Sequence, residues 1–176
     1  LTYRGTSSQP SMSDLLDITD DSNPLNIRKG NPGLKPSFTQ NFRMFYNNYI
    51  QSHQRSIMAH MNFQTTSNSI SNMVTYDEKT GGRTTRPENI NGNWNAFGMF
   101  MFNTAIDSTG FFNMNTFTTL RYANSVGYVS TDRNSGSQKS TTRTTTVSER
   151  MAGSYRNDWL EFELNGSLEY MHARSV

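Results

Sequence analysis

The sequence predicts an all-β protein, an antiparallel up-and-down meander of about six long strands that forms part of a larger transmembrane β-barrel. First, only 33% of the 176 residues are hydrophobic and 17% are charged, whereas aromatic residues reach 12%. Second, apolar and polar residues alternate with a period of two over long stretches. Third, the turns between these stretches alternate in length. The composition suits strands with one apolar and one wet face.

Two parts are expected along the chain. Residues 1–37 are predicted to be an irregular loop and lead-in, with one helical turn at 13–16. Three prolines and two glycines in residues 23–36 exclude a helix there and predict a rigid, extended segment. Residues 38–176 are predicted to be the barrel segment, with strands at about 38–50, 55–76, 83–106, 111–129, 140–156 and 159–174.

The last hairpin is the sharpest prediction of register. If Asn157 and Asp158 form a two-residue turn, Tyr155 lies opposite Leu160 and each later pair keeps apolar residues together on one side. Glu149 then lies on the apolar side, opposite Gly166, so either a bulge intervenes or this face is not in lipid at that height.

Alternation assigns side chains to two faces. The lipid face is expected to carry Phe42, Met44, Tyr46, Ile57, Met61, Phe63, Phe100, Phe102, Phe112, Met114, Leu120, Leu160, Phe162, Leu164 and Leu168. Aromatic girdles are expected at Trp94, Tyr122, Trp159 and Tyr170, near strand ends. The lumen is expected to carry Arg43, His60, Asn62, Asn95, Met99, Met101, Arg121, Arg150, Glu161 and Glu163, and those from Asn95 onward in this list are the candidate ligand-facing residues.

The turns suggest two different rims. Turns at 51–54, 107–110 and 157–158 are short, whereas those at 77–82 and 130–140 are longer, as in outer-membrane barrels; a soluble meander could show the same pattern. The longest apolar run, residues 96–102, is too short for a membrane helix. A helical membrane protein is therefore excluded, and a barrel is not.

Little in the sequence indicates chemistry. The chain has no cysteine, and its three histidines, His53, His60 and His172, show no metal-ligand spacing. Glu161, Glu163 and Glu169 share a face and could suggest a carboxylate pair, but with Arg150, Arg156 and Arg174 nearby a charged lumen wall is favoured. Phe97, Met99, Met101 and Phe117 could line an apolar ligand patch, although contact with another protein segment is favoured. No catalytic residue, metal or cofactor is expected, and a net charge of +2 without a basic cluster argues against nucleic acid.

Three segments resemble a known family. NPLNIRKGNPGLKPSFTQNF at residues 23–42, RPENINGNWNAFG at 86–98 and YRNDWLEFELNGSLEY at 155–170 are similar to outer membrane β-barrel proteins of Bacteroidota, a branch of the TonB-dependent receptor superfamily. Gly30, Asn31, Pro32, Leu34, Lys35 and Pro36 match the motif that precedes a barrel strand in that family. The resemblance implies an outer-membrane barrel closed by a plug, which imports a ligand with energy delivered by TonB.

The chain departs from a full family member, since no plug, TonB box or signal peptide is recognisable. We therefore expect a piece of the barrel wall, in contact with outer-membrane lipid, with the plug and a TonB-type protein as partners of the parent protein. Alone, such a piece is expected to self-associate through its two open sheet edges. The alternative is a soluble β-sheet binding module, a β-sandwich or curved sheet with the apolar face as its core; a carbohydrate is one ligand to consider, with Trp94 or Trp159 as stacking platform. An enzyme is a distant third hypothesis.

Overall fold

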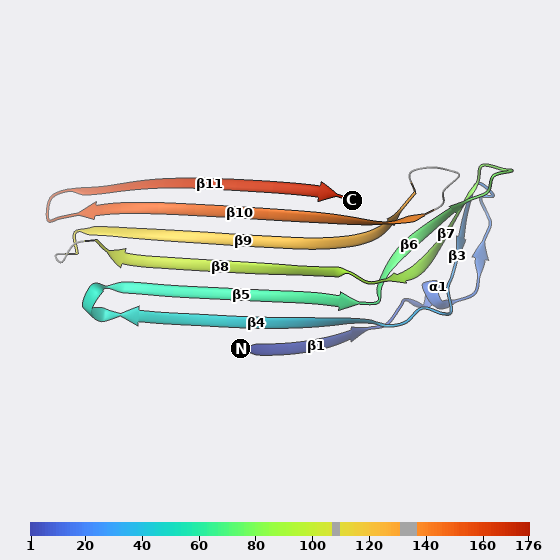
Figure 1. The fold of residues 1–176 in the computed structure, drawn as a ribbon, viewed down its shortest axis with the longest axis horizontal. Coiled ribbons are helices and arrows are strands. Elements are labelled where there is room, and N and C mark those ends of the chain that lie inside the picture. Colours follow the sequence, from blue (N-terminus) through green and yellow to red (C-terminus); the bar gives the residue numbers. More distant parts are fainter. Residues whose placement is uncertain (107–109, 131–136) are drawn as a thin grey trace.

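A computed structural model describes residues 1–106, 110–130 and 137–176. It shows two sheets that meet at one end of the molecule (Figure 1). The large sheet has the order β1-β4-β5-β8-β9-β10-β11, with bounds Thr2–Ser8, Ser37–Ile50, Arg55–Ser67, Asn93–Ala105, Phe112–Val129, Gln138–Arg156 and Glu161–Ser175. The small sheet has the order β2-β3-β7-β6, with bounds Thr19–Asp20, Asn26–Lys29, Arg83–Ile90 and Ser69–Tyr76.

All neighbouring strands of the large sheet are antiparallel, which confirms the all-β, antiparallel fold class. The small sheet contains one parallel pair, β3 with β7. The described helical segments are α1, Met12–Leu15, and the 3₁₀ turn η1, Gln51–His53. No helix among the described residues has the length and apolar character needed to cross a membrane.

The lead-in contains three strands, β1, β2 and β3, where an irregular loop was predicted. β1 pairs with β4 over its whole length, from Thr2 opposite Arg43 to Ser8 opposite Ser37. Between Thr2 and Ser8 only Tyr3 is large and apolar, so the alternation that identifies other strands is missing. The helical turn is close to its predicted place, with Ser11 as N-cap.

The two strands predicted at 55–76 and 83–106 are each divided in two. Asn68 has a φ of 55° and Gly92 a φ of 121°, and at these residues the backbone leaves the large sheet. The Oδ1 atom of Asn91 accepts a hydrogen bond from the backbone N–H of Asn68 at 2.7 Å, which joins the two bends. β6 and β7 therefore form a hairpin that belongs to the small sheet. Apolar residues change from odd positions on β5, such as Met61 and Phe63, to even positions on β6, such as Ile70 and Val74, so the alternation changes phase at the first bend. A single strand over 55–76 was therefore the wrong prediction.

The last hairpin has a longer turn than predicted. The backbone N–H of Asn157 donates to the carbonyl of Leu160, and the Asn157 side chain accepts from the backbone N–H groups of Trp159 and Leu160. Tyr155 consequently pairs with Phe162 rather than with Leu160, and Glu149 pairs with Leu168 rather than with Gly166. The shift is an even number of residues, so every side chain stays on its predicted face.

The sheet has two different ends (Figure 1). At one end lie η1 and the turn at 157–160, which we call the turn rim. At the other end lie the small sheet and the segment 30–36, which we call the small-sheet rim. The predicted turn at 107–110 and loop at 130–140 fall largely on residues 107–109 and 131–136, outside the described residues.

Candidate functional site

The face predicted to contact lipid carries a row of aromatic rings near the small-sheet rim. Ring centroids are 4.9 Å apart for Tyr3 and Phe42, 6.2 Å for Phe42 and Phe63, 5.7 Å for Phe63 and Trp94, and 4.9 Å for Trp94 and Tyr122. Each ring comes from a different strand, so the row crosses β1, β4, β5, β8 and β9 without interruption. Aromatic rows of this kind mark a membrane–water boundary in outer-membrane barrels.

A second aromatic group lies on the same face at the turn rim. Tyr155 contacts Phe112 at 4.5 Å and Phe111 at 6.5 Å between ring centroids, and Phe162 lies opposite Tyr155 on β11. Phe112 and Tyr122 are ten residues apart on β9, about 33 Å along the strand. At a strand tilt of about 40° this corresponds to about 25 Å across a membrane, the height of the apolar band of such barrels.

The side chains between the two aromatic groups are mostly apolar and are uncovered, with Glu149, Thr116 and Thr118 as polar members. Leu164 is 67% exposed and Leu168 76% exposed, although both belong to a regular paired strand. We call this surface the outward face. It includes all the predicted lipid-facing residues that lie within strands, because cross-strand partners point the same way.

The candidate ligand-facing residues share the opposite face, which we call the lumen face. Asn95, Met99 and Met101 lie on β8, Arg121 lies opposite Phe97 and Arg150 opposite Phe117. Glu161 and Glu163 lie opposite Arg156 and Ser154 at the turn rim. Their role toward a ligand stays a prediction. Arg174 is not part of the predicted charged lumen wall. It lies on the outward face, because it pairs with Arg143.

The middle of the lumen face is apolar rather than polar. A ring contact of 6.5 Å joins Phe45 to His60, another of 6.4 Å joins His60 to Phe97, and the Arg121 guanidinium lies 5.2 Å from the centre of the Phe97 ring. Met99 lies directly opposite His60. We call this surface the lumen patch; it consists of Phe45, Met58, His60, Phe97, Met99, Met101 and Phe117.

A groove continues the lumen patch toward the turn rim. Its volume is about 350 Å³. Met58, Met101 and Phe117 form its apolar part, and Arg150 supplies a cation. Side-chain amides of Asn47, Asn103 and Asn115 complete the lining. The groove can thus accept an apolar group that carries an anion or a carbonyl beside it.

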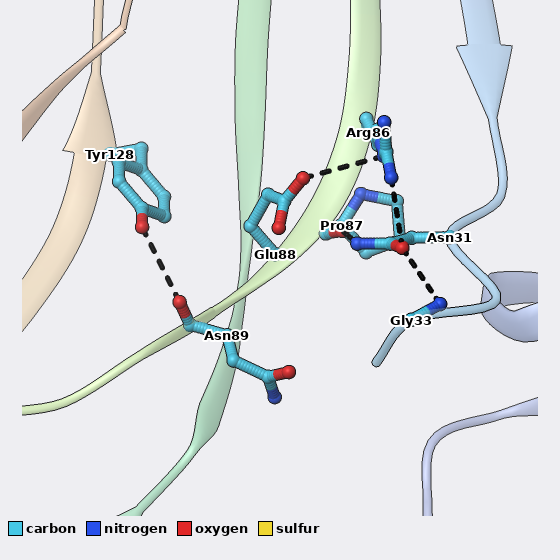
Figure 2. Close-up of polar contacts among 7 residues, drawn as sticks. All are labelled: Asn31, Gly33, Arg86, Pro87, Glu88, Asn89 and Tyr128. Atoms are coloured by element: carbon cyan, nitrogen blue, oxygen red, sulfur yellow. Dashed lines mark hydrogen bonds and ion pairs between the residues drawn. The ribbon is translucent and has the colours of Figure 1, made fainter. Parts of the chain in front are cut away.

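The family motif at residues 30–36 is attached to the small sheet through its three buried residues, Gly30, Asn31 and Leu34. Asn31 is 4% exposed and makes a compact set of hydrogen bonds (Figure 2). Its Nδ2 donates to the Pro87 carbonyl at 2.9 Å, and its Oδ1 accepts from Arg86 at 2.9 Å and from the Gly33 backbone N–H at 3.0 Å. Arg86 also forms an ion pair with Glu88 at 3.3 Å.

Lys35 and Leu34, farther along the motif, also attach it to the small sheet. The Lys35 backbone N–H donates to Asn89 Oδ1 at 2.8 Å, while Asn89 Nδ2 donates to the carbonyls of Lys35 and Asn68, each at 3.0 Å. Leu34 and Ile90, at 7% and 4% exposure, are the buried hydrophobic residues of the described chain. Pro32 and Pro36 are exposed and border the turn.

Gly30 is required by close packing. A Cβ atom there would lie 1.7 Å from the carbonyl oxygen of Leu16, so no other residue fits without moving the backbone. The hydrogen bonds of Asn31 and Lys35 interlock residues 30–36 with residues 86–90, so two of the three family-like segments are in contact. Sequence reasoning identified both segments but not their contact, since nothing in either pattern specifies a partner more than 50 residues away.

A second groove, of about 280 Å³, lies between α1 and the small sheet. Leu16 and Ile18 meet Arg28 and Asp20 in its lining. Hydrogen bonds from Ser22, its side chain first and then its backbone N–H, lower the pKa of Asp20. Among the described residues no three acidic, histidine or cysteine side chains come close enough to hold a metal ion.

Comparison with known proteins agrees with this geometry. A family model described as "Outer membrane protein beta-barrel family" matches residues 1–174. No curated protein and no solved structure matches the chain. The family match covers almost the whole chain and places it in the outer membrane. The chain therefore belongs to the outer membrane protein β-barrel family.

Proposed function

We propose that this chain is a wall segment of a TonB-dependent receptor-like barrel of the kind found in Bacteroidota, which binds or takes up a ligand at the cell surface and catalyses no reaction. The lumen patch is the observation that carries this proposal. A water-filled pore gives no reason to expose phenylalanine and methionine side chains together, whereas a surface covered by another protein segment does.

The cover that we propose is a plug-type domain of the parent protein. Arg121 and Arg150 border the lumen patch, so the covering segment is expected to place apolar side chains on Met99 and Phe97 and acidic or amide groups beside the two arginines. Energy from a TonB-type protein would then shift that cover, and the groove beside the patch would be opened or reshaped for a ligand.

A pair of consecutive residues on β8 allows a matched cross-linking test. Met99 lies on the lumen face and Phe100 on the outward face. A photoreactive amino acid at position 99 of the full-length protein should cross-link to a part of the same protein outside the seven-stranded sheet, whereas position 100 should react with lipid. Equal protein cross-linking at the two positions, or none at position 99, would contradict a covered lumen patch.

Energy coupling is tested without knowing the ligand. In cells that carry Met99→Cys, labelling by a membrane-impermeant maleimide should increase when the membrane is energised, and only if the TonB-type protein is present. Asp20→Cys is the control, because this exposed residue of β2 should be labelled in both states. If the labelling of Met99→Cys is the same with and without the TonB-type protein, the barrel is passive and the proposal is wrong.

The soluble alternative lacks support from the fold. A sheet-binding module would bury the apolar face as its core, but this face is uncovered, and Leu164 and Leu168 are among its most exposed members. Trp94 is packed between Phe63 and Tyr122 in the aromatic row rather than free as a stacking platform, whereas Trp159, the other platform considered, is 84% exposed.

The isolated chain has two unpaired edges in the large sheet, on β1 and β11. We propose that the 176-residue piece alone self-associates through these edges, because open edges expose unpaired backbone groups. Sedimentation of the purified piece in detergent tests this, and a stable monomer would contradict it.

A further inference from the structure

We propose that the outward face at the small-sheet rim binds the phosphate groups of a phosphorylated glycolipid of the outer leaflet, the lipid A type, through Arg143 and Arg174. The two arginines are direct cross-strand partners on β10 and β11. They continue the outward series of β11, in which Leu168, Tyr170 and His172 alternate with lumen-facing residues.

The pairing of the two arginines is unfavourable unless an anion lies between them. Direct cross-strand partners have Cβ atoms about 5 Å apart, and like charges in that position destabilise a sheet. The nearest carboxylate on the outward face of the described parts of β9, β10 and β11 is Glu149, about 20 Å from Arg143 along the strand. The chain thus places two guanidinium groups together and supplies no described counter-ion.

Two further nitrogen donors lie on the same face. His172 pairs with Thr145 and lies diagonally beside Arg143. Lys139 lies farther toward the rim on β10, where its Nζ donates to the Asn91 carbonyl at 2.9 Å. Arginine forks bind the oxygens of phosphate and carboxylate groups in bidentate geometry, so a cluster of this composition is an anion site rather than a metal site. Its height on the sheet then favours a lipid phosphate.

The height of the cluster fits a lipid headgroup. Tyr122 marks the aromatic level on this side, and its row of cross-strand partners runs through Thr145 to His172. Arg174 lies two residues beyond His172, about 7 Å along β11 and roughly 5 Å above that level at barrel tilt. Lipid phosphates lie just outside the acyl region, where basic side chains bind headgroups. The longer connections lie at this rim, which assigns it to the cell exterior.

The test uses the full-length protein purified in detergent and examined by native mass spectrometry with bisphosphorylated lipid A. Wild type should retain the lipid, and Arg143→Gln/Arg174→Gln should retain it about tenfold less or worse. Arg4→Gln/Arg156→Gln is the charge-matched control, because both residues lie on the lumen face, and it should behave as wild type. Arg143→Lys/Arg174→Lys should fall between, since charge is kept and the fork is lost.

The source of the phosphate is separated by two further probes. Lipid A without phosphates should bind wild type about as weakly as the glutamine variant binds the intact lipid, and millimolar inorganic phosphate should not displace the lipid. A heat-modifiability gel confirms that each variant is an assembled barrel. Equal retention by wild type and the glutamine variant, equal retention of the dephosphorylated lipid, or displacement by free phosphate would each overturn the proposal.

Discussion

A lysine placed on the outward face should destabilise the barrel according to its depth. Phe162 lies at the aromatic level of the turn rim, Leu164 lies two residues farther along β11, and Phe100 lies near the middle of β8, six residues from Trp94. These positions sample the boundary, an intermediate depth and the centre of a band about 25 Å high. A single series of three lysine substitutions therefore tests the orientation of the whole sheet.

The magnitude follows from the depth of each residue. A lysine on the lipid face lowers the free energy of unfolding by about 2–4 kcal/mol at the midplane and by about 0–1 kcal/mol near the interface. Two residues of a tilted strand correspond to about 5 Å of depth. We therefore expect the free energy of unfolding to fall by about 0.5 kcal/mol for Phe162→Lys, by about 1.5 kcal/mol for Leu164→Lys and by about 3 kcal/mol for Phe100→Lys.

The assay is urea unfolding of the full-length protein refolded into lipid vesicles, with folding followed by heat-modifiability. Glu163→Lys is the matched control, because Glu163 is the neighbour of Leu164 on the lumen face and is exposed. It should change the free energy of unfolding by less than about 0.5 kcal/mol. An equal loss for Glu163→Lys and Leu164→Lys, or a series without the expected order, would refute the assignment of the two faces.

Three further changes test the rim and the outward face. Asn31→Ala should lower the free energy of unfolding by about 2–3 kcal/mol, because buried partners lose their hydrogen bonds, whereas Asn23→Ala at an exposed turn should cost little; thermal unfolding of the two variants measures the difference. Gly30→Ala should reduce the assembled fraction on heat-modifiability gels, while Gly153→Ala, with no atom within 4 Å of its Cβ, should not. Glu149→Gln should raise stability in vesicle unfolding by about 1 kcal/mol, since it removes a carboxylate from the apolar face; a decrease would indicate a partner for this carboxylate.

The faces of the strands were predictable from the sequence, and the partners were not. Alternation alone determines which way a side chain points, so Met99 and Phe100 lie on opposite faces whatever the register. The partner of Tyr155 depends on the length of the turn, and the sequence does not show that the Asn157 side chain accepts hydrogen bonds from two backbone N–H groups and extends that turn. The resulting shift changes every pair of the last hairpin and leaves both faces intact.

The small sheet could not be predicted from periodicity. The alternation reverses its phase between β5 and β6, which only hints at a bend, and β7 shows no apolar alternation at all. Two residues with positive φ, Asn68 and Gly92, make the bends. Asparagine and glycine are frequent in this chain, so their presence alone does not locate a bend. The bends become necessary only when Asn89 is seen to bridge the carbonyls of Asn68 and Lys35, which requires the fold.

The motif at residues 30–36 is connected to the large sheet through the hydrogen bonds of Asn89. Asn31 holds the Pro87 carbonyl and Arg86, so β7 is fixed against the lead-in immediately before β4 begins at Ser37. β7 in turn leads through Gly92 into β8, two strands away from β4 in the large sheet. The interlock therefore ties β4 and β8 together at one rim independently of β5 between them. A barrel whose lumen patch is covered by a movable segment needs such a rim, because force applied to the cover would otherwise separate the strands that the cover contacts.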